Sequence, residues 1–206
     1  MMYKYLSQTH KDSTKDSAGF SLIEVLVAVS VLLLIMVGPM TIIVQSSRSS
    51  SFATDQATAY FLAQEGIELA QNIRDGYQLA HIKDPVATPN PWDDFKTAVN
   101  DCTSSGGCSL EMGSGVNPTV AVASCSGTNP CRLYLDDGTG TKERQHFRYD
   151  DGAFAVNDKT KYKRAITITF SGDQAEVAST VTWKSEGILA ESEVAVKTFL
   201  YDIYGN

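Results

Sequence analysis

A single carboxylate interrupts an otherwise apolar run near the start of the chain. Glu24 lies five residues after Gly19, within the sequence FSLIEVLVAVSVLLLIMVGPMTIIV that covers residues 20–44. An ionised carboxylate inside a membrane helix costs on the order of a few kcal/mol at the bilayer centre and less near an interface. Such a side chain either serves a function or lies shallow enough to reach the headgroups. We expect a function for Glu24.

The four cysteines are the second group of residues with evident chemistry. Cys102 and Cys108 are separated by five residues, as are Cys125 and Cys131, and all four follow the apolar run. An even number in a short region is typical of disulfides formed in an oxidising compartment. The simplest pairing is 102–108 with 125–131, while 102–131 with 108–125 and 102–125 with 108–131 stay open. A zinc site is the competing interpretation, but the usual C-x2-C spacing is absent.

The remaining polar residues show no catalytic pattern. His81 and His146 are isolated, and no Ser-x-x-Lys, Gly-x-Ser-x-Gly or His-Glu-x-x-His arrangement accompanies them. We therefore predict no enzyme, no cofactor and no metal site. Residues 136–140 (DDGTG) and 150–152 (DDG) carry oxygens that calcium could bind, but neither matches a full EF loop. Both sequences favour hairpin turns, with calcium binding as the alternative.

The apolar run is long enough to cross a membrane as one helix. Its 25 residues would rise about 37 Å at ~1.5 Å per residue, against a hydrocarbon core of roughly 30 Å. Lys4, Lys11 and Lys15 precede the run, whereas only Arg48 follows it before Arg74. The positive-inside rule therefore predicts a cytoplasmic N-terminus, with the cysteine-bearing part outside.

The position of Gly19 distinguishes this segment from an ordinary secretory signal, in which the cut follows the apolar region. Here the small residue precedes that region. The sequence GFSLIEVLVA from Gly19 onward resembles the processing site of type IV prepilins and type II secretion pseudopilins. The motif combines Gly at the cut, Phe20 at the new terminus and Glu24 four residues later. The resemblance covers roughly residues 15–75.

The resemblance implies a processing and assembly route. A prepilin peptidase would remove the leader, residues 1–19, and N-methylate Phe20. Glu24 would then attract the Phe20 amine of a neighbouring subunit and set the register of assembly. The implied partners are the peptidase, other pilin or pseudopilin subunits, an inner-membrane assembly platform, and membrane lipid before assembly. The implied location is the bacterial cytoplasmic membrane, crossed once, and then a pilus or pseudopilus outside the cell.

Gly38-Pro39 lies near the end of the apolar run. Proline lacks an N–H and clashes with the preceding turn, so we expect the helix to kink or melt locally there. The pair resembles the helix-breaking Gly/Pro region of pilins, where a melted stretch lets the helix extend in the filament.

Beyond a Ser-rich stretch at 46–51, the chain regains helical periodicity. Small and apolar residues recur every three or four positions: Ala59, Leu62, Ala63, Gly66, Ala70 and Ile73. We predict that residues 45–76 form the amphipathic second half of the helix, with Gly76 supplying the C-cap. The stripe is either core contact or filament interface, and the sequence favours neither.

The rest of the chain divides into a connection and a sheet. Residues 77–131 should form an irregular, variable connection that holds the disulfides, with a short helix near 93–100. Period-two alternation then predicts strands at 132–135, 146–149, 164–170, 176–183 and 192–200. We therefore predict an antiparallel β-sheet head over residues 132–206. The fold class is α+β and pilin-like, a long N-terminal helix, transmembrane in its first half, packed on that head.

Charge and motifs together leave two functions. The net charge of −7 and the absence of a basic run argue against direct binding of nucleic acid. The first function is a minor pilin or pseudopilin that assembles into a type IV pilus or a type II secretion-like filament. The alternative is a single-pass, membrane-anchored extracytoplasmic binding protein, but an anchor alone has no need of Gly19 and Glu24 at these positions. Filaments for adhesion, motility, DNA uptake and secretion share this N-terminal chemistry, which does not choose among them.

Overall fold

The structure is a computed structural model of the 206-residue chain. It describes residues 19–112, 120–127, 131–136, 146–149, 159–185 and 190–203. The predicted leader up to residue 18 and the aspartate-rich turns at 137–140 and 150–152 lie outside the described residues. The chain divides into two units, residues 1–49 and 50–206, and each is considered by itself.

The first unit contains the beginning of helix α1 (Leu22–Lys83). Residues 19–51 are all exposed, including the apolar side chains of the predicted span. Within the described part of the chain, α1 is the one helix long and apolar enough to cross a membrane, and none of its apolar stretch is buried. Exposed apolar surface of this extent favours contact with lipid or with other protein chains.

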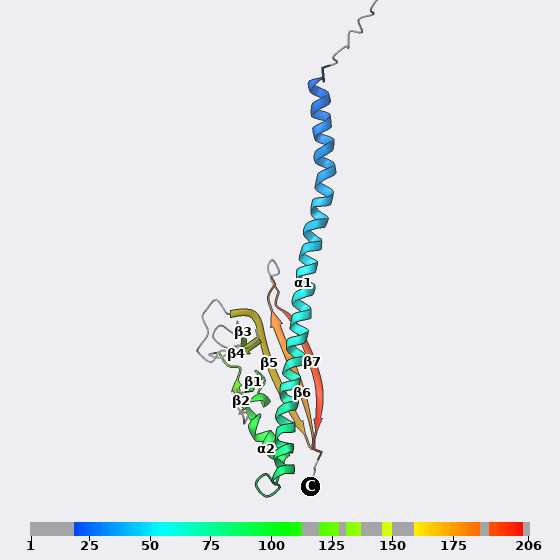
Figure 1. The fold of residues 1–206 in the computed structure, drawn as a ribbon. Coiled ribbons are helices and arrows are strands. Elements are labelled where there is room, and N and C mark those ends of the chain that lie inside the picture. Colours follow the sequence, from blue (N-terminus) through cyan, green and yellow to red (C-terminus); the bar gives the residue numbers. More distant parts are fainter. Residues whose placement is uncertain are drawn as a thin grey trace, which may run out of the picture. The chain divides into compact units, whose positions relative to one another are not determined.

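The second unit contains the rest of α1, which packs on a sheet (Figure 1). The predicted stripe is buried: Ala59, Leu62, Ala63, Gly66, Ala70 and Ile73 all face the interior, together with Ile67. The spacing of three and four residues places these side chains on one face of the helix. The stripe is therefore core contact in this fold.

The predicted end of the helix near Gly76 is wrong, because α1 continues to Lys83. Gly76 lies within regular helix, and a Cβ there would meet no atom of the described residues within 4 Å. The helix stops before Asp84-Pro85, where proline disfavours a helical conformation of the preceding residue. The Asp84 carboxylate then accepts hydrogen bonds from the N–H groups of Val86 and Ala87 and starts the turn.

The connection after α1 is more regular than the sequence suggested. Helix α2 (Pro91–Ala98) begins with a proline in its first turn, and a 3-10 turn, η1 (Asn100–Thr103), follows. The short helix predicted near 93–100 is thus confirmed. Strands β1 (Cys108–Met112) and β2 (Val120–Ser124) pair with each other in the same segment, which corrects the prediction of an irregular stretch.

The head sheet has seven strands in the described part of the chain. The other five are β3 (Arg132–Asp136), β4 (His146–Tyr149), β5 (Lys159–Ser171), β6 (Gln174–Trp183) and β7 (Ser192–Tyr201). The order is β2-β1-β5-β3-β4, with β6 paired to β5 and β7 paired to β6, and every pairing is antiparallel. These bounds confirm the five predicted strands and the α+β fold class.

Two apolar clusters hold α1 on the sheet. The first joins the end of the stripe to α2, η1 and the middle of the sheet, with Phe95, Leu110 and Ile166 fully buried. The second joins the start of the stripe to β3, β4 and the end of β6, with Leu133 and Trp183 almost completely buried. The alternation of buried residues along β5 and β6 is the period of two expected for a sheet covered on one face.

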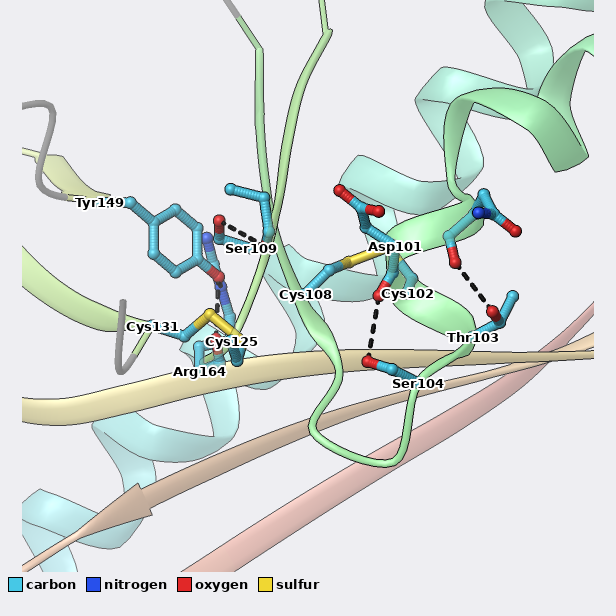
Figure 2. The surroundings of a disulfide bond; sticks show 12 residues. Asp101, Cys102, Thr103, Ser104, Cys108, Ser109, Cys125, Cys131, Tyr149 and Arg164 are labelled. Atoms are coloured by element: carbon cyan, nitrogen blue, oxygen red, sulfur yellow. Dashed lines mark hydrogen bonds between the residues drawn. A yellow bond between two sulfur atoms is a disulfide. The ribbon is translucent and has the colours of Figure 1, made fainter. Parts of the chain in front are cut away.

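The cysteines form the two small-loop disulfides, Cys102–Cys108 and Cys125–Cys131 (Figure 2). This is the simplest of the three pairings that the sequence left open. Cys102 and Cys108 are completely buried in the first cluster, and Cys131 is buried in the second. The disulfides therefore fasten the connection to both halves of the core.

Candidate functional site

Gly19 and Phe20 lie outside regular helix at the start of the described chain. Both are exposed, and Phe20 presents 80% of its surface. A Cβ at Gly19 would meet no atom of the described residues within 4 Å. A peptidase can therefore approach the Gly19–Phe20 bond without displacing other described parts of the chain.

Glu24 lies in the first turn of α1, which begins at Leu22. The N–H of Val25 donates to the carbonyl of Ser21 at 3.2 Å, so Glu24 lies within the turn that this hydrogen bond closes. Unpaired N–H groups give this end of a helix a partial positive charge, which stabilises an acidic side chain. Cleavage after Gly19 would add the α-amino group of Phe20 to the same positive region.

The predicted break at Gly38-Pro39 is not present in this structure, because α1 runs through both residues as helix. Here the hydroxyl of Thr41 donates to the carbonyl of Gly38 at 2.7 Å. The missing N–H of Pro39 still leaves the carbonyl one turn earlier, on Ile35, without its usual helical donor.

These residues fall in a recognised signature. Residues 14–38 match the model of the prokaryotic N-terminal methylation motif. The match includes Gly19, Phe20 and Glu24 and ends at Gly38. The methylation motif is the prepilin-type signature of type IV pilins, so the predicted resemblance is confirmed over this segment. No curated protein and no solved structure matches the chain.

A buried arginine joins helix to sheet in the second unit. Arg164 of β5 is only 2% exposed and donates to the Tyr149 hydroxyl at 2.8 Å and to the Leu62 carbonyl at 3.1 Å. Its Nη1 also lies 2.8 Å from the carboxylate of Glu65 on α1. Burial alone would lower the pKa of Arg164, but its interactions with Tyr149 and Glu65 outweigh burial and raise it. The guanidinium therefore stays charged and fixes α1 on the sheet.

Burial also raises the pKa of the Tyr149 phenol, against the opposing effect of the Arg164 charge. Tyr149 in turn donates its hydroxyl to the Arg164 carbonyl at 3.1 Å, and its ring lies under the guanidinium (Figure 2). The phenol and the guanidinium thus hold each other beside the Cys125–Cys131 disulfide. Their arrangement is structural, because both polar groups are satisfied inside the protein.

A second set of polar contacts holds the part of α1 that begins the second unit against the sheet. The buried carboxylate of Asp55 pairs with Lys161 and accepts a hydrogen bond from Ser185 at 2.9 Å. Ser185 in turn accepts from the indole N–H of Trp183 at 3.2 Å. Burial would raise the pKa of Asp55, but the hydrogen bonds from Lys161 and Ser185 and the charge of Lys161 outweigh it and lower the pKa.

The described residues contain no group of three or more His, Cys, Asp or Glu side chains that could hold a metal ion. The cysteines are consumed in disulfides within that part of the chain. His81 Nδ1 lies 2.6 Å from the carbonyl of Thr88, which ties the end of α1 to the following turn. Gly19, Phe20 and Glu24, the predicted processing and assembly residues, lie at or just before the start of α1.

Sequence reasoning missed Arg164 and Asp55. A period-two signal could have found the arginine, because Arg164 shares its sheet face with Ile166 and Ile168, both buried. Asp55 lies four residues before Ala59, so the 3.6-residue period places it on the buried stripe. Charged residues at inward positions mark polar contacts between α1 and the sheet.

Proposed function

We propose that this chain is a structural filament subunit, a minor pilin or pseudopilin, that a prepilin peptidase processes after Gly19. The subunit then assembles through the apolar start of α1 into a type IV pilus or a type II secretion-like filament. The observation that carries this proposal is the methylation motif at residues 14–38 on a helix whose apolar side chains are exposed. The role is structural and not enzymatic.

The exposed apolar surface of residues 20–44 supports two successive environments for the subunit, the membrane and then the filament. In the first stage the helix crosses the bacterial cytoplasmic membrane, with the N-terminus inside and the disulfide-bearing head outside. In the second stage an inner-membrane assembly platform extracts the subunit, and the helices of neighbouring subunits replace the lipid. Both environments cover the same apolar side chains, so little apolar surface meets water at either stage.

Glu24 is the residue that we expect to set the register of assembly. Its carboxylate would be costly among packed apolar helices unless a cation neutralised it. The α-amino group of Phe20 on a neighbouring subunit supplies that cation only after cleavage. Attraction between opposite charges grows in a low-dielectric core. A misplaced subunit would leave both charges unpaired and would lose that attraction. Cleavage would thereby license assembly.

Gly38-Pro39 is the place where we expect α1 to open when the filament forms. The Ile35 carbonyl lacks the N–H that any other residue at position 39 would supply, so the helix is held there by fewer hydrogen bonds. Glycine at position 38 further lowers the cost of leaving the helical conformation. An opened stretch would let the two parts of α1 adjust separately in the filament.

The test of this function is incorporation of a Glu24→Ala variant in cells that carry an assembly machine and a prepilin peptidase. The matched control is Glu68→Ala, which removes an exposed carboxylate from the same helix. Both variants should insert in the membrane, but only Glu68→Ala should appear in sheared filaments. Equal incorporation of the two variants would refute the register role. Equal retention of the wild type and both variants in the membrane would favour the anchored binding protein.

A further inference from the structure

The two disulfides of the head close loops of equal length but differ in their exposure to solvent. In each, the paired cysteines are separated by six positions in the sequence. Cys102 and Cys108 both have 0% of their surface exposed and lie in the first apolar cluster. Cys131 is 1% exposed, whereas Cys125 is only partly buried, and its neighbours in sequence on both sides are exposed. Of the four, Cys125 is therefore the cysteine that a reagent in solution reaches most directly.

Backbone strain marks the same disulfide. Cys131 has a φ of 51° and is the one non-glycine residue with positive φ among those that the structure describes. This left-handed conformation is disfavoured for a residue with a Cβ. Two constraints act on Cys131, namely its bond to Cys125 and a hydrogen bond of 2.9 Å in which its carbonyl accepts from the N–H of Arg164. Opening the disulfide removes the first constraint, so the strain at Cys131 favours the open form.

Backbone hydrogen bonds hold both cysteines in place independently of the disulfide. The N–H of Cys125 donates to the carbonyl of Gly107 at 2.9 Å, and the carbonyl of Cys131 accepts from Arg164. Strand β2, which ends next to Cys125, is paired with β1, and β3, which begins next to Cys131, is paired with β4 and β5. The two thiols would therefore stay close together after reduction, and the bond could form again as a reaction between groups that are already held near each other.

We propose that Cys125–Cys131 is an exchangeable disulfide that reacts with the dithiol of a redox protein, whereas Cys102–Cys108 is a permanent structural bridge. Disulfides that are exposed or strained are the labile and regulatory ones, and both properties meet at Cys125–Cys131. Exchange would remove the covalent link between the end of β2 and the start of β3 while the buried bridge keeps the core closed. This exchange needs only the head, so it is independent of peptidase processing and of filament assembly.

The exchange consists of two balanced steps. In the first, a thiolate of the partner attacks the Sγ of Cys125, a mixed disulfide forms, and Cys131 leaves as a thiolate that takes a proton from water. In the second, the other thiolate of the partner attacks the partner's sulfur in the mixed disulfide, and Cys125 leaves and is protonated in the same way. The head gains two thiols, and the partner dithiol is oxidised to a disulfide.

The first test is reduction of the full chain in mild detergent with dithiothreitol, followed by quenching with iodoacetamide and mass spectrometry of the cysteine peptides. Cys125 and Cys131 should be alkylated at least about tenfold faster than Cys102 and Cys108, because reduction of a buried bridge must wait until the core opens. Tryptophan fluorescence of the same samples should stay native while the first pair is alkylated. This measurement uses the wild-type chain, so it does not depend on the folding of a variant.

The second test identifies the sulfur that is attacked. The probe is a thioredoxin in which serine replaces the second cysteine of the Cys-x-x-Cys motif, so that it cannot complete the second step. It should stay linked to the chain through Cys125. The matched control is Cys125→Ser/Cys131→Ser, which keeps the other disulfide, closed over the same number of residues, and should form no adduct.

Four results would overturn the inference. Equal alkylation rates for the two cysteine pairs, or faster alkylation of Cys102 and Cys108, would show that exposure and strain do not select Cys125–Cys131. Loss of native fluorescence before any cysteine is alkylated would show that reduction follows unfolding. An adduct on Cys131 in place of Cys125 would show that attack does not take place at the more exposed cysteine.

Discussion

Gly66 of α1 packs so closely on the sheet that the one methyl group added by a Gly66→Ala substitution should disturb the contact between them. A Cβ there would lie 2.3 Å from the Oγ of Ser179, 3.1 Å from its Cβ and 3.2 Å from the Cδ of Arg164. Carbon atoms pack best at roughly 3.5–4.0 Å. Arg164 cannot withdraw easily, because hydrogen bonds to Tyr149 and to the Leu62 carbonyl fix its guanidinium. The Gly66→Ala variant must therefore move α1 or distort the sheet.

The magnitude follows from two opposing effects. Overpacking a core by one methyl group costs about 1–3 kcal/mol, whereas alanine in place of glycine within a helix contributes about 1 kcal/mol of stability. Gly66→Ala should therefore lower the free energy of unfolding by about 0–2 kcal/mol. The matched control is Gly76→Ala, in the same helix but with no atom of the described residues within 4 Å of the new Cβ. That control should gain the full helical stabilisation.

Urea unfolding of the full chain in mild detergent, followed by tryptophan fluorescence, measures both variants. The Ser179 hydroxyl has no hydrogen-bond partner among the described residues, so Ser179→Ala alone should cost little. Combined with Gly66→Ala it removes the closest contact and should restore about 1 kcal/mol. The reasoning is refuted if Gly66→Ala raises the unfolding midpoint as Gly76→Ala does.

Three further predictions concern the polar and covalent contacts of the head. The pKa of Asp55 is lowered from 3.8, so its stabilisation is complete above that pH and fades as the pH falls toward the folded value. Asp55→Asn should lack this acid dependence in urea titrations between pH 2 and pH 6, taken at roughly one-unit steps. Gly107→Ala should lower the thermal midpoint, because the backbone φ is 71° and a Cβ would lie 2.9 Å from a carbonyl oxygen; an unchanged midpoint would contradict this. Replacing both Cys102 and Cys108 with serine should cost at least ~2 kcal/mol in urea unfolding, the loop-entropy contribution of the disulfide alone, and a smaller loss would contradict that contribution.

Sequence periodicity correctly predicted the helix and the strands in which buried side chains recur at a regular spacing. The stripe from Ala59 to Ile73 lies on one helical face, so its burial follows from a spacing of three and four residues. The strands after Cys131 alternate with a period of two, and the structure places β3 to β7 on them. Gly76 misled the helix end because glycine can cap a helix but also tolerates its interior, whereas Pro85 cannot continue one.

The elements that periodicity could not predict depend on contacts between residues distant in sequence. Strand β1 was missed because its pairing with β2 and with Ile166 of β5 is not evident from a five-residue segment between cysteines. The predicted processing site needed no tertiary information, because the methylation motif that contains Gly19, Phe20 and Glu24 is recognised along the chain itself.

The most direct test of the account is the identity of the first residue of the mature protein. Intact mass and N-terminal sequencing of the membrane-extracted chain, expressed with and without a prepilin peptidase, measure it. The account predicts a chain that begins at N-methylated Phe20 only when the peptidase is present. An intact Met1 in both strains, or a cut beyond Val44, would contradict the account and favour an anchored or secreted binding protein.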